Sequence, residues 1–149
     1  MKRVYVDPDV CMGCGLCEVY CLTQHSRSLD ILKAYRQEKP RPVARIRVER
    51  HGNTAFGFQC RQCSEPLCVY ACVSGATFLD DHGQVAFDES RCIGCWTCVL
   101  ACPYGAIARD DARERVARCD LCGDPQGDGL PACVRNCPNE ALSVREEAV

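Results

Sequence analysis

The chain has 149 residues, about the length of one domain, and sixteen of them are cysteine, or about 11%. Without the cysteines the 47% hydrophobic fraction falls to about 36%, which is thin for an ordinary side-chain core. The formal net charge of −2 argues against nucleic acid as a partner, because phosphate binding requires a basic surface. The sequence contains no run of about 18 apolar residues that would span a membrane.

The N-terminal segment does not resemble a signal peptide. Asp7, Pro8 and Asp9 interrupt it before an apolar stretch can form. We therefore expect a cytoplasmic protein, although a folded subunit can also be exported with a partner that carries the signal. Disulfides are rare in the reducing cytoplasm, so the cysteines are expected to be metal ligands.

All sixteen cysteines fall into four groups of four, numbered here in chain order. Groups 1 and 3 have the spacing C-x2-C-x2-C-x3-C: Cys11, Cys14, Cys17 and Cys21, and Cys92, Cys95, Cys98 and Cys102. Group 2 has the spacing C-x2-C-x4-C-x3-C: Cys60, Cys63, Cys68 and Cys72. Group 4 has the spacing C-x2-C-x10-C-x3-C, with residues 123–132 as an inserted loop: Cys119, Cys122, Cys133 and Cys137.

The spacing of groups 1 and 3 is that of bacterial ferredoxins, in which three cysteines hold one [4Fe–4S] cluster and the fourth reaches another. Gly13, Gly15 and Gly94 lie between ligands, where a missing Cβ lets the backbone approach inorganic sulfide. Zinc sites usually combine two C-x2-C pairs a dozen or more residues apart. Only group 4, and group 2 less well, would suit zinc. The spacing therefore favours iron–sulfur clusters over a zinc-binding interaction module.

A short unit recurs around the cysteine groups: a strand, the ligand loop, a helical turn with the fourth cysteine, and a second strand. Residues 4–6 and 85–87 are the expected strands before groups 1 and 3. Residues 75–79, 105–108 and 140–144 are the expected strands after groups 2, 3 and 4. These β-α-β repeats predict an α+β fold, and four units correspond to two two-cluster ferredoxins.

The segment between groups 1 and 2 does not fit the repeat. We expect a short helix over residues 29–35, ending before Pro40, and a strand over residues 43–50 where apolar and charged residues alternate. A turn at 51–53 and a return strand at 54–58 complete a hairpin. This insertion is expected to cover the clusters or to meet a partner.

The charges are unevenly distributed along the chain. Residues 22–59 hold eight Lys or Arg against three acids, whereas residues 80–149 hold seven Arg against thirteen acids. The two regions are candidate docking faces for partners of opposite charge, or simply solvated faces. His25, His51 and His82 are not assigned as ligands. Trp96 either packs over a cluster and limits its contact with water or makes ordinary packing contacts.

The four motifs together resemble the four-cluster [4Fe–4S] ferredoxin family, the iron–sulfur subunits of molybdenum and tungsten oxidoreductases, formate dehydrogenases and hydrogenases. In length and motif the chain is most similar to the small electron-transfer subunits that accompany tungsten aldehyde oxidoreductase or carbon monoxide dehydrogenase. The resemblance implies one domain over residues 1–149, in which one ferredoxin unit is nested inside another. The outer unit takes residues 1–25 and 115–149, the inner unit 56–112, and the basic helix and hairpin insertion 26–55.

The resemblance also implies how the sixteen cysteines hold four [4Fe–4S] clusters, because the family pairs group 1 with group 4 and group 2 with group 3. The outer clusters are then held by Cys11, Cys14, Cys17 and Cys137, and by Cys119, Cys122, Cys133 and Cys21. The inner clusters are held by Cys60, Cys63, Cys68 and Cys102, and by Cys92, Cys95, Cys98 and Cys72.

The function implied is that of a non-catalytic electron-transfer subunit, and we expect no catalytic residues. Its clusters would relay single electrons between a large catalytic subunit and a second redox partner. The catalytic subunit would be a tungsten or molybdenum–pterin enzyme of the aldehyde or formate oxidoreductase type. The second partner would be a reductase subunit, a soluble carrier or another copy. The alternatives are a subunit of carbon monoxide dehydrogenase or hydrogenase, and a free polyferredoxin shuttle.

Overall fold

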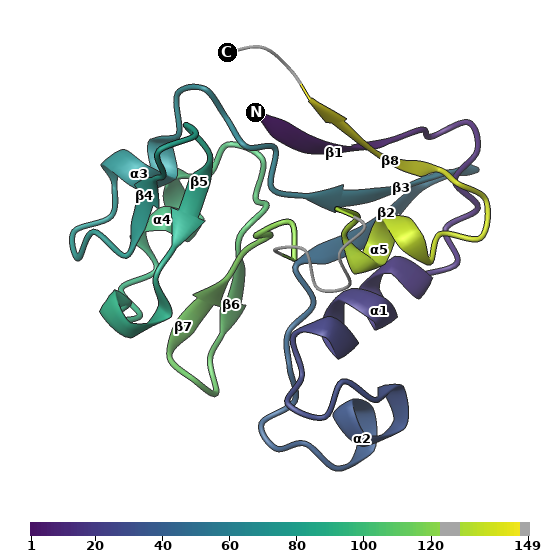
Figure 1. The fold of residues 1–149 in the computed structure, drawn as a ribbon, viewed down its shortest axis with the longest axis horizontal. Coiled ribbons are helices and arrows are strands. Elements are labelled where there is room, and N and C mark those ends of the chain that lie inside the picture. The colour runs from purple at the N-terminus through teal and green to yellow at the C-terminus, as the bar shows by residue number, and fades with distance from the viewer. Residues whose placement is uncertain (123–128, 147–149) are drawn as a thin grey trace.

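The computed structural model describes residues 1–122 and 129–146 (Figure 1). In chain order the elements are β1 (Lys2–Val6), α1 (Leu16–Gln24), α2 (Ile31–Arg36), β2 (Ile46–His51), β3 (Thr54–Gln59), α3 (Leu67–Tyr70), β4 (Thr77–Leu79), β5 (Val85–Phe87), the 3₁₀ turn η1 (Glu89–Arg91), α4 (Thr97–Ala101), β6 (Ala108–Asp110), β7 (Arg115–Ala117), α5 (Ala132–Arg135) and β8 (Leu142–Glu146). The strands form four two-stranded antiparallel sheets within the described ranges. Short helices alternate with these sheets, so the fold is α+β, as expected.

The two ends of the chain meet in one lobe, at the right of Figure 1. β1 pairs with β8, with Val4 opposite Val144, and β1 also contacts β3 of the hairpin. α1 packs against α5 and β2. We call residues 1–59, 119–122 and 129–146 the terminal lobe. Its buried core is shared by aliphatic side chains and cysteines, namely Val4, Cys17, Cys21, Ile46, Cys133 and Leu142.

The insertion forms the helix and the hairpin that the sequence predicts. Asp30 caps α2 by accepting a hydrogen bond from the Lys33 N–H at 2.8 Å. The hairpin pairs β2 with β3 in register from Ile46 opposite Gln59 to His51 opposite Thr54. The strand expected from residue 43 begins only at Ile46. The Arg45 N–H donates instead to Cys21 Sγ at 3.2 Å, so the thiol replaces a strand partner.

Residues 60–117 form a second lobe, at the left and lower centre of Figure 1, and we call it the central lobe. α3 contacts α4 and β4, and each sheet, β4 with β5 and β6 with β7, pairs only three residues on each strand. β5 has the predicted bounds. The strand expected over 105–108 begins only at Ala108, because the Ala106 N–H donates to Cys102 Sγ at 3.4 Å. The buried core again mixes aliphatic side chains with cysteines, namely Cys68, Val85, Cys98, Ile107 and Val116.

The helices carry the third cysteine of each group rather than the fourth. Among the helices of the described residues, α1 alone is long enough to contain both the third and the fourth cysteine of its group, Cys17 and Cys21. α3, α4 and α5 span four or five residues and end before Cys72, Cys102 and Cys137. Pro103 and Pro138 directly follow Cys102 and Cys137, and a proline disfavours helical geometry in the residue before it. The expectation of a helical turn that contains the fourth cysteine was therefore wrong for groups 2, 3 and 4.

Most of the loop that the sequence places between Cys122 and Cys133, residues 123–128, lies outside the described residues.

Among the helices of residues 1–122 and 129–146, none has the length and apolarity required to cross a membrane.

Candidate metal centres

Two pockets of the central lobe are lined by four cysteines each. In both, three cysteines come from one group and the fourth is the last of the other group. One, which we call the Cys60 pocket, contains Cys60, Cys63, Cys68 and Cys102. The other, which we call the Cys92 pocket, contains Cys92, Cys95, Cys98 and Cys72. The chain therefore brings groups 2 and 3 together by exchanging their last cysteines.

The terminal lobe brings groups 1 and 4 together. Cys21 packs with Cys133 in the buried core, and Cys137 packs against that core. Burial raises the pKa of Cys133 most, and the next largest effects come from Cys21 and Cys122. In the same way burial raises the pKa of Cys119, with Cys133 and Cys21 adding to it. Cys21 thus lies among the cysteines of group 4.

The remaining cysteines of group 1 are more open to solvent. Cys14 is exposed and Cys11 is half-buried, on the loop that leads into α1. The charges of both raise the pKa of Cys17, although burial is the largest cause and brings that pKa to about 12. Cys11, Cys14 and Cys17 are therefore close enough to interact.

Two of the glycines between ligands, Gly13 and Gly94, allow close packing within the chain. Gly13 has a φ of +69°, and a Cβ there would lie 2.7 Å from the Cβ of Ala55. Gly94 has a φ of +67°, and a Cβ there would meet the backbone oxygen of Glu114. The positive φ and the close protein neighbours therefore explain why glycine occupies both positions. Their expected approach to inorganic sulfide stays a prediction.

Burial keeps several of the free thiols in the protonated form. It raises the pKa of Cys98 and of Cys122 to about 11. A metal binds the thiolate, so loading must displace protons from these groups. Cys95 differs, because the hydroxyl of Thr97 and its backbone N–H lower its pKa.

Hydrogen-bond donors point at the sulfur atoms of both lobes. Backbone N–H groups donate hydrogen bonds to the sulfur atoms of Cys21, Cys72 and Cys102, and side chains donate to those of Cys60 and Cys95. Arg45 N lies 3.2 Å from Cys21 Sγ, Thr77 N 3.4 Å from Cys72 Sγ, and Ala106 N 3.4 Å from Cys102 Sγ. Arg118 Nη2 lies 3.2 Å from Cys60 Sγ, and Thr97 Oγ1 lies 3.4 Å from Cys95 Sγ. Such donors stabilise thiolate ligands and influence the potential of a cluster.

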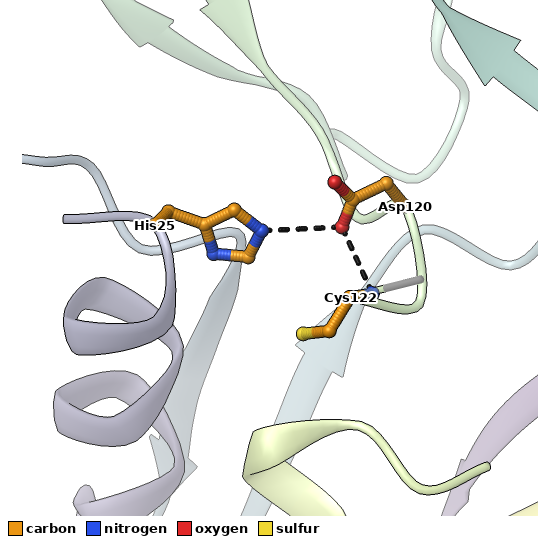
Figure 2. Close-up of side chains that lie close together, drawn as sticks. All are labelled: His25, Asp120 and Cys122. Atoms are coloured by element: carbon orange, nitrogen blue, oxygen red, sulfur yellow. Dashed lines mark hydrogen bonds and ion pairs between the residues drawn. The ribbon is translucent and has the colours of Figure 1, made fainter. Parts of the chain in front are cut away.

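His25 connects the end of α1 to group 4, as Figure 2 shows. Its Nε2 lies 3.2 Å from Oδ1 of Asp120, and its Nδ1 lies 2.7 Å from the backbone oxygen of Cys21. Asp120 also accepts from the Cys122 N–H at 3.0 Å and pairs with the guanidinium of Arg45. These hydrogen bonds and this ion pair therefore connect the group 4 loop to the end of α1 and to the start of the hairpin.

The charges in this network stabilise one another. Burial opposes protonation of His25, but hydrogen bonds to Asp120 and Cys21 outweigh it and raise its pKa to about 9. Burial also disfavours the Asp120 carboxylate, but His25 and Arg45 hold its pKa below the usual range. The sequence predicts no ligand role for His25, although its position four residues after Cys21 brings the two residues together at the end of α1.

Trp96 lines the Cys92 pocket, and the guanidinium of Arg109 lies 4.5 Å from its ring centroid. Its indole is half-buried. Its place at this pocket fits the interpretation that Trp96 packs over a cluster, which stays a prediction.

The donor sets fit iron–sulfur clusters. Each central pocket offers the four thiolates that a [4Fe–4S] cluster requires, with N–H groups directed at sulfur. The buried guanidinium of Arg118 supplies a second test. Its Nε and Nη1 have no hydrogen-bond partner among the residues described, so it requires further anionic acceptors such as cluster sulfur.

Comparisons with known proteins give the same cofactor. A family model described as "4Fe-4S dicluster domain" matches residues 53–147. An "Iron-sulfur protein" of Rhodospirillum rubrum is 39% identical over 154 aligned residues, covering 95% of this chain and 80% of that protein. The "Electron transport protein HydN" of Escherichia coli (strain K12) is 36% identical, covering 95% of this chain and 86% of that protein.

A solved structure is also similar over the whole chain. It is the active site complex BamBC of benzoyl coenzyme A reductase in complex with benzoyl-CoA. The matching chain is 27% identical with a TM-score of 0.52, and the match covers 100% of this chain and 81% of that one. The iron–sulfur assignment made from cysteine spacing is confirmed, and the chain belongs to the 4Fe–4S dicluster domain family of ferredoxin-type proteins.

Proposed function

We propose that this chain is a non-catalytic electron-transfer subunit of an oxidoreductase complex and that it carries four [4Fe–4S] clusters. The observation that carries the proposal is the gathering of four cysteines in each central pocket, with the last cysteines of groups 2 and 3 exchanged. One-electron transfer is the chemistry that such clusters supply when bound.

The ligand sets follow from that exchange. The inner clusters are held by Cys60, Cys63, Cys68 and Cys102, and by Cys92, Cys95, Cys98 and Cys72. The outer clusters are held by Cys119, Cys122, Cys133 and Cys21, and by Cys11, Cys14, Cys17 and Cys137. The position of Cys21 among group 4, and the packing of Cys137 against the same core, support the outer assignments.

We also propose that the fold nests one ferredoxin unit inside another. The outer unit takes residues 1–25 and 115–149, and the inner unit takes residues 56–112. The β1–β8 pair and the α1–α5 contact support this division, because each joins segments from the two ends of the chain. Residues 26–55 are then an insertion that covers the outer unit.

The residues around the sites hold and tune the clusters rather than react. The cysteines fix the clusters, the N–H donors stabilise their negative charge, and the buried aliphatic side chains limit contact with water. No proton transfer is required of the protein when a cluster accepts or releases one electron.

The partner is proposed to be a large catalytic subunit with a tungsten or molybdenum–pterin site of the aldehyde or formate oxidoreductase type. A reductase subunit, a soluble carrier or another copy would exchange electrons at the other end. Similarity to a chain of a two-component active site complex, and to an electron transport protein, supports a role between enzymes and carriers. The cytoplasmic location stays a prediction.

Iron and acid-labile sulfide analysis of the intact protein tests this function. We expect about sixteen iron and sixteen sulfide per chain, with broad absorbance near 400 nm. About eight iron, or stoichiometric zinc, would contradict four clusters. Size-exclusion chromatography of native extract separates a docked subunit from a free shuttle, because a shuttle elutes at the mass of the single chain.

A further inference from the structure

Arg118 is a buried cation that the electron-transfer function does not by itself explain. It lies between the end of β7 and Cys119, and only 1% of its surface is exposed. Its Nη2 donates to Cys60 Sγ at 3.2 Å, while its Nε and Nη1 have no partner in the part of the chain that the structure describes. A buried guanidinium is costly unless it faces an anion. Within those residues its hydrogen-bond partner is Cys60 Sγ, which would carry the required negative charge as a ligand of a cluster.

Arg118 also stands where the two lobes meet. Cys119, the next residue, belongs to the terminal lobe, and Cys60 contributes to the high pKa of Cys119. On the other side, the charge of Arg118 reaches Cys68 and opposes the rise in pKa that burial causes there. The cation therefore acts on at least two cysteines of the Cys60 pocket.

The sulfur atoms of the Cys92 pocket accept hydrogen bonds from neutral donors in the part of the chain that the structure describes. The Thr77 N–H donates to Cys72 Sγ, and the Thr97 hydroxyl donates to Cys95 Sγ, each at 3.4 Å. Arg109 lies nearby over Trp96, but its charge is paired with Asp111 at 2.7 Å. Burial and other cysteines have the largest effects on the pKa of Cys98, and no cation is among them.

A cation beside a cluster favours the reduced state, because reduction adds one negative charge. The potential of a [4Fe–4S] cluster depends on net charge, on hydrogen bonds to sulfur and on exposure to solvent. A charge-assisted hydrogen bond in a buried site is stronger than a neutral one. The cation beside the Cys60 pocket therefore favours reduction of a cluster held there over reduction of one held in the Cys92 pocket.

We propose that Arg118 sets the order of potentials in the central lobe, making the Cys60 pocket the more easily reduced of the two. The cysteines of the Cys92 pocket would then hold the cluster that donates one electron, and those of the Cys60 pocket the cluster that accepts it, with no proton transferred. This inference rests on the proposed function, since both pockets must hold [4Fe–4S] clusters. Arg118 is a positioning residue that acts through Cys60 and the cluster.

A redox titration of the intact protein, followed by electron paramagnetic resonance, tests the inference with three variants. In Arg118→Gln one midpoint potential should fall, with reduction at least tenfold less favourable, which corresponds to about 59 mV for a one-electron couple. Arg118→Lys keeps the charge but loses the planar fork of donors, so its reduction should be about threefold less favourable. The affected signal should be the one altered in Cys60→Ser.

Arg61→Gln is the matched control. Arg61 lines the same pocket and is exposed, with its guanidinium 5.0 Å from the ring centroid of Tyr104. Solvent screens its charge, so its removal should change the equilibrium less than Arg118→Lys does. Unchanged potentials in Arg118→Gln at full iron content would overturn the inference, and so would equal shifts in Arg61→Gln.

Iron content separates this inference from the proposed function. If Arg118→Gln does not retain all its iron, Arg118→Lys decides, and an unchanged midpoint potential in that variant overturns the role of Arg118. A wild-type protein without its four clusters would instead overturn the proposed function.

Discussion

The terminal and central lobes are built around equal numbers of cysteines but differ in the secondary structure that surrounds them. In the terminal lobe β1 and β8 pair over five residues and β2 and β3 over six. In the central lobe each sheet pairs only three residues on each strand, and α3 spans four residues. Two-stranded sheets are marginal on their own, and shorter ones more so. We therefore expect the stability of the central lobe to depend more on the clusters proposed there.

Side-chain hydrogen bonds and an ion pair add to this difference in supporting structure between the lobes. Three arginines from the hairpin segment bind distant parts of the chain. Arg45 pairs with Asp120, Arg50 donates to the Gly13 oxygen, and Arg47 donates to the Gly105 oxygen at 2.7 Å. These arginines are engaged within the protein, which favours the insertion as a cover over the cluster sites.

Removing iron should have the largest effect. Chelation or acid should abolish cooperative unfolding of the whole chain, because the two small cores include cysteines whose ligand role would be lost. Hydrogen–deuterium exchange should reach unfolded rates across residues 60–117 and should leave weak protection in the β2–β3 hairpin. A cooperative melt of the iron-free protein, or equal loss in both lobes, would contradict this difference.

Replacing Ile46 by alanine should have the next largest effect. Ile46 is 1% exposed and packs in the core with Val4 and Leu142. The cavity should lower the local free energy of unfolding by about 2–5 kcal/mol. The loss should be confined to the terminal lobe in hydrogen exchange. Val116→Ala is the matched change in the central lobe, and it should be milder while clusters remain bound.

Replacing Asp120 by asparagine should have a smaller effect. It removes the charge that pairs with His25 and Arg45, but nearly half of the Asp120 side chain is exposed, so the loss should be about 1 kcal/mol. Hydrogen exchange in α1 and residues 119–122 should rise at full iron content. Asp111→Asn, which breaks an exposed pair with Arg109, is the control and should change little.

The effect of Asp120→Asn should depend on pH. The raised pKa of His25, about 9, means that its contribution is full below the ordinary histidine pKa of about 6.5 and is lost as pH rises through about 9. The lowered pKa of Asp120 means that its contribution is lost only in acid. The difference between wild type and variant should therefore shrink above pH 9. An unchanged difference there would show that His25 does not take part.

Much of the fold follows from sequence patterns. Cysteine spacing predicts the cofactor, alternation in residues 43–50 predicts the hairpin, and the unit that recurs around the cysteine groups predicts β5. The late starts of β2 and β6 have one cause, which is competition between sulfur and the backbone for N–H groups. Arg45 and Ala106 donate to sulfur where the sequence predicts strand pairing. Local periodicity contains no information about these distant thiols.

The sequence predicts the cysteine ligands more completely than it predicts the residues around them. The i to i+4 spacing of Cys21 and His25 was a usable signal for their contact. Arg118 has no such signal, because an arginine is usually exposed and its partner Cys60 lies 58 residues away. Burial of that kind depends on how the two lobes meet.

The cross-pairing of groups 1 and 4 is the central claim, and cysteine variants test it most directly. Mössbauer and electron paramagnetic resonance spectra would be compared for Cys21→Ser, Cys119→Ser and Cys17→Ser. We expect Cys21→Ser to damage the same cluster as Cys119→Ser and to leave intact the cluster that Cys17→Ser damages. If Cys21→Ser instead alters the same cluster as Cys17→Ser, each cysteine group binds its own cluster, and the nested arrangement is wrong.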